Sequence, residues 1–151
     1  MLTTCAESFI AGLDELKPLL PIHWEKLALD KEAVPLDPDY EVYFERERRG
    51  QLLYMTLRDQ GRLVGYWIAF IAPGLHYRTC LTATLDIWNL LPGYETGLAA
   101  RLLMRSIEKE YKRRGVQRSI VGEKLKLPTG KLFRAFGYRQ IEAYWSKLYE
   151  V

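Results

Sequence analysis

The stretch from Leu91 to Gly115, LPGYETGLAARLLMRSIEKEYKRRG, decides the fold. It joins a turn that is rich in glycine and alanine to an amphipathic helix. The first turn of a helix has unpaired N–H groups and the positive end of the helix dipole, and small residues let a phosphate approach the backbone. Gly97, Ala99 and Ala100 meet that requirement, although the mouth of the turn carries an acid, Glu95. The turn therefore predicts a phosphate site, the alternative being that the small residues only let the helix pack on a sheet.

The helix itself is well defined by its pattern. Its apolar face repeats every four residues, at Ala99, Leu103, Ile107 and Tyr111. Basic residues at 112–114 suit its carboxyl end, and Gly115 supplies the left-handed residue that ends it.

Upstream of this stretch, the first third of the chain has helical signals. A first helix is expected from a cap at Thr3 or Thr4 to about Leu16, and a second, PIHWEKLALD, is expected to open at Pro21. The third is LDPDYEVYFERERRG, with Asp37 as cap, Pro38 in its first position and Gly50 as its stop.

The middle of the chain changes to a strand pattern. QLLYMTLRD, GRLVGYWIAFIA and RTCLTATLDIWNL are rich in β-branched and aromatic residues, and turn residues at 59–61 and 73–74 separate them. The apolar runs are nearly continuous, which indicates a sheet covered on both faces. After the helix come a short strand VQRSIVG, a short helix TGKLFRAF ending at Gly137, and YRQIEAYWSKLYEV as a closing strand pair or one long strand. The fold class is α/β (α+β): a mixed, mostly antiparallel sheet with helices on both faces.

Length and composition set the broad class. With 151 residues, 48% hydrophobic and 27% charged, residues 1–151 are expected to form a single domain. The net charge of +3 is too small to argue for nucleic-acid binding. Cys5 and Cys80 match no metal spacing, so reduced thiols and no metal are expected. Without a signal sequence or an apolar run of membrane-spanning length, the chain is expected to be cytoplasmic and not membrane-bound.

Two local signatures in this order resemble the GNAT superfamily of acyl-CoA-dependent N-acyltransferases. One is PGYETGLAARLL running into the helix that ends KRRGV, at the place of the family's R/Q-x-x-G-x-G/A pattern; the other is LFRAFGYRQIE, similar to the family's LYxxxGF. The resemblance covers roughly residues 51–151. The earlier segments PIHWEKL and VPLDPDYEVYFERERRGQL, with GLHYR, are similar to a branch common in tailed phages, which would place the protein in the host cytoplasm.

The resemblance implies acetyl-CoA as acyl donor, with its phosphates on the turn. Without a gap, Glu95 takes the family's basic position, Leu98 the middle glycine and Ala100 the final small residue; a one-residue shift puts Tyr94, Gly97 and Ala99 there instead. Either way the expected cation is missing, and Arg101 can replace it by reaching back to a phosphate. The turn residues expected to bind the cofactor are Glu95, Thr96, Gly97, Leu98, Ala99, Ala100 and Arg101.

Further cofactor contacts follow from the same resemblance. The family separates its fourth and fifth strands near the backbone of Trp88, Asn89 and Leu90, which is expected to hydrogen-bond the pantetheine arm. Lys124 can face the phosphates, although an exposed lysine in water is the common alternative. Phe133 aligns with the family's acidic tyrosine and cannot donate a proton, so Tyr138 and Tyr94 are the nearby candidates, or solvent serves instead.

Asp86 is the candidate general base. It is the acid inside the otherwise apolar strand TATLDIWNL, where the family commonly carries its base. Partial loss of water would raise the pKa of such a carboxyl toward useful basicity. The alternative is an aspartate paired with a lysine or arginine at the margin of the sheet.

Two aromatic pairs are candidates for the acceptor site. His23 and Trp24 lie between the first helices, where the family builds its acceptor wall, the alternative being a core tryptophan beside a surface histidine. His76 and Tyr77 lie in a loop between strands, where functional residues are common, the alternative being turn packing.

Two functions remain open from the sequence. The first is an acetyl-CoA-dependent N-acetyltransferase acting on a primary amine of a protein or a small molecule. The second is a catalytically weak or inactive binding protein on the same fold, such as a phage-encoded modulator or virion component. Glu95 and Phe133, at the family's basic and tyrosine positions, favour this second function. A homodimer through the last strand is plausible because AYWSKLYEV forms an apolar edge that needs cover.

Overall fold

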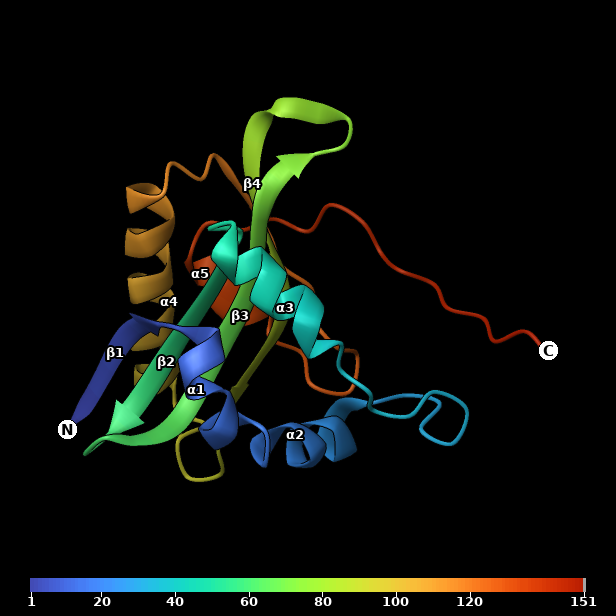
Figure 1. The fold of residues 1–151 in the computed structure, drawn as a ribbon, viewed down its shortest axis with the longest axis horizontal. Helices are drawn as coiled ribbons and strands as arrows, with labels where there is room; N and C mark the ends of the chain where they lie inside the picture. The colour runs from blue at the N-terminus through green and yellow to red at the C-terminus, as the bar shows by residue number, and fades with distance from the viewer. Residues whose placement is uncertain (151) are drawn as a thin grey trace.

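The computed structural model describes residues 1–150 and contains one mixed sheet with helices on both faces (Figure 1). The elements in chain order are β1 (Leu2–Glu7), α1 (Phe9–Leu16), α2 (Leu19–Leu27), α3 (Tyr40–Arg48), β2 (Leu52–Asp59), β3 (Arg62–Gly74), β4 (Tyr77–Leu90), α4 (Gly97–Arg113), β5 (Arg118–Ile120) and α5 (Gly130–Ala135).

The five strands lie in the order β1-β2-β3-β4-β5. The first four are antiparallel neighbours, and β5 runs parallel to β4. The hairpin between β2 and β3 turns at Gln60 and Gly61, which both have positive φ, as a two-residue turn with the right twist requires. Parallel strands need a crossover, and α4 provides it between β4 and β5. The predicted fold class is confirmed.

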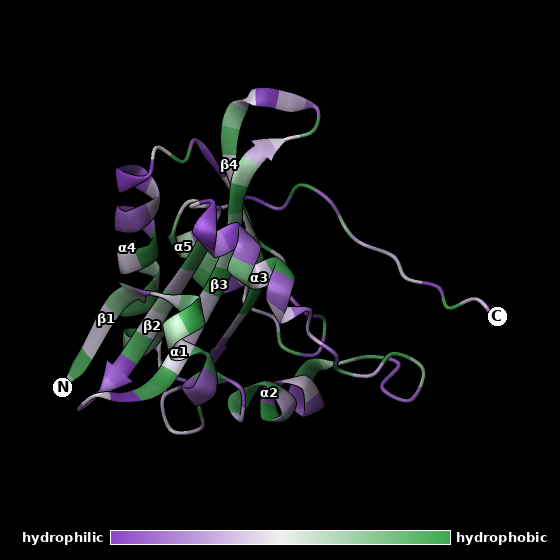
Figure 2. Cartoon of the chain, viewed as in Figure 1, coloured by the Kyte–Doolittle hydropathy of each residue, from purple (hydrophilic) through white to green (hydrophobic). Residues whose placement is uncertain are grey.

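Each face of the sheet carries its own hydrophobic core. On one face, α1, α2 and the aromatic residues of α3 pack on β2 and β3 around Phe9, Leu16 and Tyr66. On the other, α4 and α5 pack around Trp67, Leu103 and other buried side chains. The hydropathy colouring shows the strands between them as largely apolar (Figure 2). The nearly continuous apolar runs of the strands are thus explained by two covered faces.

The decisive helix is confirmed at its carboxyl end, and the structure supplies the cap at its start. Thr96 caps α4, its hydroxyl accepting from Ala99 N at 3.2 Å. Gly115 has φ of +75° and ends the helix, as predicted. The apolar face at Ala99, Leu103, Ile107 and Tyr111 is buried.

The expected first helix from Thr3 or Thr4 is wrong in its first part. Residues 2–7 form β1, which pairs with β2 along its whole length, and the helix starts only at Phe9. Ser8 is the cap, accepting from Ala11 N at 3.1 Å. The β-branched threonines suit an extended segment, and the neighbouring edge of β2 supplies the ladder that a sequence pattern does not reveal.

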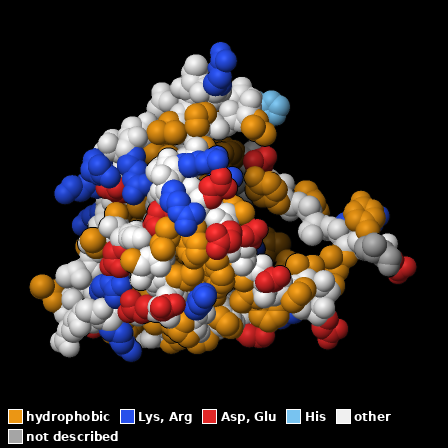
Figure 3. Space-filling model, in the orientation of Figure 1, with side chains coloured by type: hydrophobic (Ala, Val, Ile, Leu, Met, Phe, Trp, Pro, Cys, Tyr) orange, Lys and Arg blue, Asp and Glu red, His pale blue; other side chains and the backbone are white. Residues whose placement is uncertain are grey.

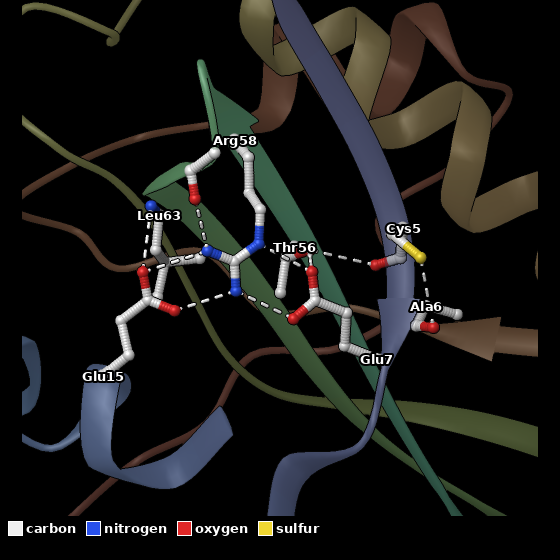
Figure 4. A network of polar contacts seen from close by, with 8 residues as sticks. Cys5, Ala6, Glu7, Glu15, Thr56, Arg58 and Leu63 are labelled. Carbon is white, nitrogen blue, oxygen red and sulfur yellow. Dashed lines mark hydrogen bonds and ion pairs between the residues drawn. The ribbon is translucent and has the colours of Figure 1, made fainter. Parts of the chain in front are cut away.

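An arginine on β2 holds this amino-terminal region in place (Figure 4). The Arg58 guanidinium donates to Glu7 of β1 at 2.7 and 2.8 Å, to Glu15 of α1 at 3.0 and 2.8 Å, and to the Gly61 carbonyl at 2.8 Å. The hydrogen bonds from Arg58 hold the pKa of both carboxyls below their usual value, against the opposing effect of burial. This network ties a strand, a helix and a hairpin turn together.

The next two helices exist but begin elsewhere than expected. α2 starts at Leu19, after Pro18, so Pro21 lies inside its first turn. α3 starts at Tyr40 with Asp39 as its cap, which accepts from Val42 N at 3.3 Å, and neither Asp37 nor Pro38 is at its start. Gly50, with φ of +69°, follows the end of α3 as predicted.

The expected closing strand or strand pair is also wrong for the residues described. Residues 139–150, here called the arm, form no strand, and every one of them is exposed. Figure 1 shows the arm leaving the body of the molecule in an extended path. A β-strand needs backbone hydrogen bonds to a neighbouring strand, and no strand within residues 1–150 forms such bonds with the arm. Val151 lies outside the described residues.

No helix within residues 1–150 has both the length and the apolar character to span a membrane.

Candidate active site

A cleft of ≈ 1350 Å³ opens where β4 and β5 separate. The two strands pair only from Thr82↔Arg118 to Thr84↔Ile120, so the later part of β4 has no β5 partner. The walls come from α2, the loop between α2 and α3, the end of β4, the first turn of α4, and the segment after β5 with the start of α5. The backbone of Trp88, Asn89 and Leu90 therefore borders the cleft, as the sequence led us to expect.

A bulge in β4 directs Asp86 toward the cleft. Ile87 pairs with Ile68 of β3 and Leu85 pairs with Ala69, so Asp86 is left without a partner. Bulges locally re-aim side chains and are common beside active sites. Here the Asp86 carboxylate lies against α3, where the Tyr43 hydroxyl donates to Oδ2 at 2.6 Å.

The surroundings of Asp86 favour a basic carboxylate. The residue is exposed to the open cleft, but the walls remove part of its hydration, and this burial raises the pKa of the Asp86 carboxyl above its usual value. The Tyr43 hydrogen bond opposes the rise. Within residues 1–150, no lysine or arginine forms an ion pair with Asp86, so the structure does not bear out the alternative of a paired aspartate.

The first turn of α4 keeps unused donors at the cleft. The hydroxyl and the carbonyl of Thr96 accept from the N–H groups of Ala99 and Ala100, respectively. The N–H groups of Gly97 and Leu98 have no hydrogen-bond partner within residues 1–150. A side chain at Gly97 would meet nothing within 4 Å, so the space over this turn is open. Unpaired N–H groups facing open space at a helix amino terminus suit an anion.

The start of α5 is different, because it is already capped. The Glu123 carboxylate accepts from Thr129 N at 2.7 Å and from Gly130 N at 2.6 Å. A carboxylate already lies at this helix start, so it suits an anion less well than the start of α4 does.

The structure places the residues of the two possible registers of the turn in different surroundings. Tyr94 points toward the β2–β3 hairpin, its hydroxyl donating to Asp59 at 2.9 Å and accepting from Arg62 at 3.1 Å. Glu95 instead lines the cleft, together with Thr96, Gly97 and Ala100. Glu95 and Ala100 on the lining agree with the register without a shift, but Gly97 lines the cleft and Leu98 does not, so the register stays a prediction. Leu98, Ala99 and Arg101 lie outside the lining; Arg101 is exposed, and its reach to a phosphate stays a prediction.

The acid at the mouth of the turn is paired. The Lys26 ammonium of α2 forms a hydrogen-bonded ion pair with Glu95, joining α2 to the approach of α4. Lys124, which was proposed to face the phosphates, also lines the cleft, as does Lys131 of α5. The cation that the sequence motif lacks is therefore supplied to the cleft by other elements.

His23 and Trp24 are brought to the cleft as expected. His23 is buried, and its Nδ1 lies 2.9 Å from the Tyr66 hydroxyl. Burial, with smaller effects of Lys26 and Lys124, lowers the pKa of His23 to about 4, so the ring is neutral near pH 7. Trp24 lies beside it with the Lys31 ammonium 5.4 Å from its ring centroid.

Phe133 and Tyr138 are not brought to the cleft. Phe133 is buried in the core, with its ring between those of Trp88 and Tyr138 at 6.4 and 5.7 Å. The Tyr138 hydroxyl donates to Ser119 of β5 at 2.9 Å, and burial raises the pKa of Tyr138. Neither residue lines the cleft, so the geometry does not support Tyr138 as a proton donor or Phe133 as a cofactor contact.

His76 and Tyr77 lie at the far end of the sheet. They form the tip of the β3–β4 hairpin, where the Arg118 guanidinium covers the Tyr77 ring at 4.9 Å. Tyr77 and Asp86 are nine positions apart along β4, a separation of roughly 30 Å at ~3.3 Å per residue. The structure therefore does not support a place for this pair in the acceptor site.

Two residues of the cleft were missed by sequence reasoning. Tyr43 has a usable signal, because the aromatic residues Tyr40, Tyr43 and Phe44 share one face of α3 at helical spacing. That face turns toward the sheet, and Tyr43 stacks on Phe9 at 5.0 Å. Lys26 has no local signal, since its partner Glu95 lies 69 residues away.

Comparisons with known proteins agree with this geometry at the level of the fold. No family model matches the sequence, and the search of curated proteins finds no match. Solved structures do match over nearly the whole chain. One is the ribosomal-protein-alanine N-acetyltransferase of Brucella melitensis biovar Abortus 2308, with a TM-score of 0.71, 14% identity, and coverage of 99% of this chain and 100% of that one.

Two further structures give the same result. A predicted acetyltransferase with acetyl-CoA from Clostridium acetobutylicum has a TM-score of 0.71 at 7% identity, covering 98% of this chain and 96% of that one. The glucosamine-6-phosphate N-acetyltransferase of Arabidopsis thaliana has a TM-score of 0.69 at 10% identity, covering 99% of each chain. The chain has the GNAT fold. At these identities the likeness is one of architecture, so the chemistry rests on the residues of the cleft.

Proposed function

We propose that this GNAT-fold protein is an acetyl-CoA-dependent N-acetyltransferase that acetylates a primary amine of a protein or a small molecule. One observation carries the proposal. The unpaired part of β4, the open first turn of α4 and the bulged Asp86 all border one cleft. They provide backbone groups for an extended ligand, donors for an anion and a basic carboxylate in a single place.

The residues present fit acetyl-CoA. Gly97 leaves open space over the N–H groups of the α4 turn, and the small Ala100 lets a pyrophosphate approach the backbone. Lys26, Lys124 and Lys131 add positive charge along the lining. The free edge of β4 at residues 88–90 suits the amide groups of a pantetheine arm. When bound, acetyl-CoA would supply the acetyl group as a thioester.

Asp86 is proposed to take the proton of the acceptor amine. An amine must lose a proton as its nitrogen bonds to the acetyl carbon, and a carboxylate of raised pKa in reach of the cleft can accept it directly or through a water. Tyr43 orients the carboxylate by donating to Oδ2 and leaves Oδ1 for the amine or the water. With Tyr138 committed to Ser119 outside the lining, the departing thiolate takes its proton from solvent.

The cleft favours a cationic amine carried on an apolar group. Asp30, Asp37 and Asp86 place carboxylates along the acceptor side. Trp24, Val34 and other apolar side chains of α2 and the following loop make up much of its wall. Because His23 is neutral near pH 7, it adds no charge that would repel a protonated amine.

Three further expectations belong to this proposal. The resemblance of the amino-terminal segments to a phage branch suggests a protein that acts in a host cytoplasm. A homodimer through the last residues is expected from their exposed apolar side chains. Nucleic acid is not an expected partner.

The test has two parts. Because a ligand that binds only the folded state raises the unfolding midpoint, acetyl-CoA should raise the melting temperature in a concentration-dependent way. Thiol release with a panel of primary amines then measures turnover. A melting shift without turnover would leave a binding protein on this fold, and the absence of both would remove the proposal.

A further inference from the structure

His23, Tyr66 and Asn89 form a buried polar cluster beside the cleft. They come from α2, β3 and β4, and are 7%, 0% and 8% exposed. His23 and Asn89 line the cleft, and Figure 3 shows this face of the molecule hollowed, with hydrophobic and acidic side chains around the opening. Buried polar groups are nearly always hydrogen-bonded, and each can only donate or accept in fixed ways, so the direction of each hydrogen bond can be worked out.

The Tyr66 hydroxyl is the centre of this cluster. Tyr66 and Asn89 are register partners on β3 and β4, so their side chains lie on the same face of the sheet. The hydrogen bond with Asn89 lowers the pKa of Tyr66, against the larger effect of burial, and a group that donates to the phenol oxygen has that effect. The Asn89 amide therefore donates to Tyr66, and the hydroxyl proton of Tyr66 is left for Nδ1 of His23, 2.9 Å away.

The direction of this second hydrogen bond places the proton on the His23 ring. Burial, with smaller effects of Lys26 and Lys124, lowers the pKa of His23 to about 4, so near pH 7 the neutral ring carries one N–H group. Because Nδ1 accepts from the Tyr66 hydroxyl, that N–H group is at Nε2.

The Nε2 atom of His23 is open to the cleft. Within residues 1–150, the buried side-chain polar atoms that lack a partner are the Tyr54 hydroxyl and Thr129 Oγ1. Nε2 is not one of them, although its ring makes its hydrogen bond through Nδ1, so Nε2 is not sealed inside the protein. His23 lines the cleft, so its N–H group is a donor held in place by Tyr66 and offered to a ligand.

The position of His23 places the ligand atom on the acceptor side. Asn89 lies three positions after Asp86 on β4, about 10 Å at ~3.3 Å per residue. An amine held at Asp86 and an oxygen held at His23 are therefore several bonds apart. The carboxylates of Asp30, Asp37 and Asp86 line the same cleft and disfavour an anionic oxygen there.

We propose that the Nε2–H group of His23 selects acceptors that carry an uncharged oxygen, a carbonyl or a hydroxyl, several bonds from the primary amine. Tyr66 and the Asn89 side chain are positioning residues, because they act through the proton on His23. The identity of the ligand as an acceptor rests on the proposed acetyl transfer, whereas the place of the proton does not. A site built to hydrogen-bond a substrate group rejects the analogue that lacks it.

Nitrogen NMR of the ring tests the place of the proton without any activity. The chain has two histidines, so labelling with ¹⁵N-histidine gives two sets of ring signals, and His76→Gln identifies the set of His23. At pH 7 the unmodified chain should show the proton on Nε2. Tyr66→Phe removes the donor to Nδ1 and should show a measurable fraction of the other tautomer. A proton on Nδ1 in the unmodified chain, or an unchanged ring in Tyr66→Phe, overturns the proposal.

Matched amines then test the selection. Primary amines of equal length that end in an amide, a hydroxyl or a methyl group are compared over a series of lengths. Added with coenzyme A, which has no acetyl group to transfer, an amine ending in an amide or a hydroxyl should shift the His23 Nε2 signal more than the methyl analogue does. The larger of those two shifts identifies the oxygen as carbonyl or hydroxyl. Equal shifts for all three, or no shift at any length, overturn the selection.

Two variants at position 23 measure the hydrogen bond. His23→Leu removes the donor, so the ratio of kcat/KM for the oxygen-bearing amine to that for the methyl analogue should fall roughly 2- to 10-fold, mainly through KM. His23→Gln can accept from Tyr66 and still present an N–H group, so it should restore most of the ratio. An unchanged ratio in His23→Leu overturns the selection.

The NMR titration separates this inference from the proposed function. If the unmodified chain acetylates no amine, the proposed function fails, and the shifts of the His23 signal still decide which ligands the ring binds. If His23→Leu does not fold because the Tyr66 hydroxyl is left unpaired, the same titration on the unmodified chain gives the answer.

Discussion

The Tyr43 hydroxyl of α3 donates a hydrogen bond of 2.6 Å to Oδ2 of Asp86, the residue at the bulge of β4. The bulge and the helix together define the carboxylate's position. The bulge removes Asp86 from the strand ladder and turns it toward α3, and Tyr43 then occupies one of its two oxygens. If Asp86 is the base, a carboxylate held in this way needs no rearrangement before it accepts a proton.

Asp86→Asn should abolish most turnover while the fold survives. Asparagine keeps the shape of the side chain but cannot act as a base, so thiol release with a primary amine should fall by ~10²–10⁴-fold. Acetyl-CoA affinity, measured by calorimetry, should be unchanged because the carboxylate is not a phosphate contact. Equal turnover by the two proteins would show that Asp86 is not the base. The amide oxygen of asparagine can still accept the Tyr43 hydrogen bond, so a Tyr43 contact retained in Asp86→Asn is the check that the variant has folded.

Tyr43→Phe should move the acidic limb of the pH–rate profile to higher pH. The Tyr43 hydrogen bond lowers the pKa of Asp86 against the effect of burial, so its removal raises that pKa. A higher pKa keeps the base protonated, and inactive, up to a higher pH. Tyr40→Phe is the matched control, since Tyr40 lines the same cleft on the same helix without a hydrogen bond to Asp86 in the described structure. If the pH–rate profile of Tyr43→Phe matched that of the unmodified chain, the Tyr43 hydrogen bond would not set the pKa of the catalytic base.

Glu95→Gln should tighten acetyl-CoA binding. The change releases the Lys26 ammonium from its ion pair and removes a negative charge from the approach to the α4 turn. Both side chains are partly exposed, where a charge pair is worth ~0.2–1 kcal/mol, so a gain of roughly 1.4- to fivefold in affinity is expected. Lys26→Ala should weaken binding, and Glu45→Gln, in an exposed ion pair with Arg49 elsewhere, should leave it unchanged. Weaker binding in Glu95→Gln would mean that Glu95 serves the cofactor site by orienting Lys26.

His23 should make the fold sensitive to mild acid. Burial lowers the folded-state pKa of His23 to about 4 from an ordinary value of 6.5, so between these values the unfolded chain binds the extra proton. Stability is therefore complete above pH 6.5 and is lost as the pH falls toward 4, by about 2 kcal/mol between pH 7 and pH 5. Urea unfolding at the two pH values measures the loss.

Two substitutions check this assignment. His23→Gln keeps a group that can hydrogen-bond the Tyr66 hydroxyl but does not titrate, so its stability should change little between pH 7 and pH 5. His76→Gln, at the exposed hairpin tip, should behave as the unmodified chain does. If His23→Gln showed the same acid loss as the unmodified chain, the sensitivity would belong to another group.

The sequence by itself determined the elements whose signals are local. Helix α4 follows from its apolar period, its basic carboxyl end and its terminal glycine, and the β2–β3 hairpin follows from Gln60 and Gly61 between two apolar runs. The nearly continuous apolar strands indicated two covered faces. Asp86 stood out because an acid in an apolar strand must be paired or used. Each of these inferences depends on residues within a few positions of one another.

Tertiary structure decided whatever depends on a distant partner. Residues 2–7 became a strand because the edge of β2 was free beside them, whereas residues 139–150 have strand-forming side chains and no strand, since no edge in the described chain meets them. Tyr43 reaches Asp86, and Lys26 reaches Glu95, only because α2 and α3 pack over the end of β4. Tyr138, His76 and Tyr77 had suitable chemistry but, like Phe133, lie outside the cleft. A sequence pattern describes a residue and its neighbours along the chain, whereas the candidate site is formed by residues that are far apart in the sequence and close together in space.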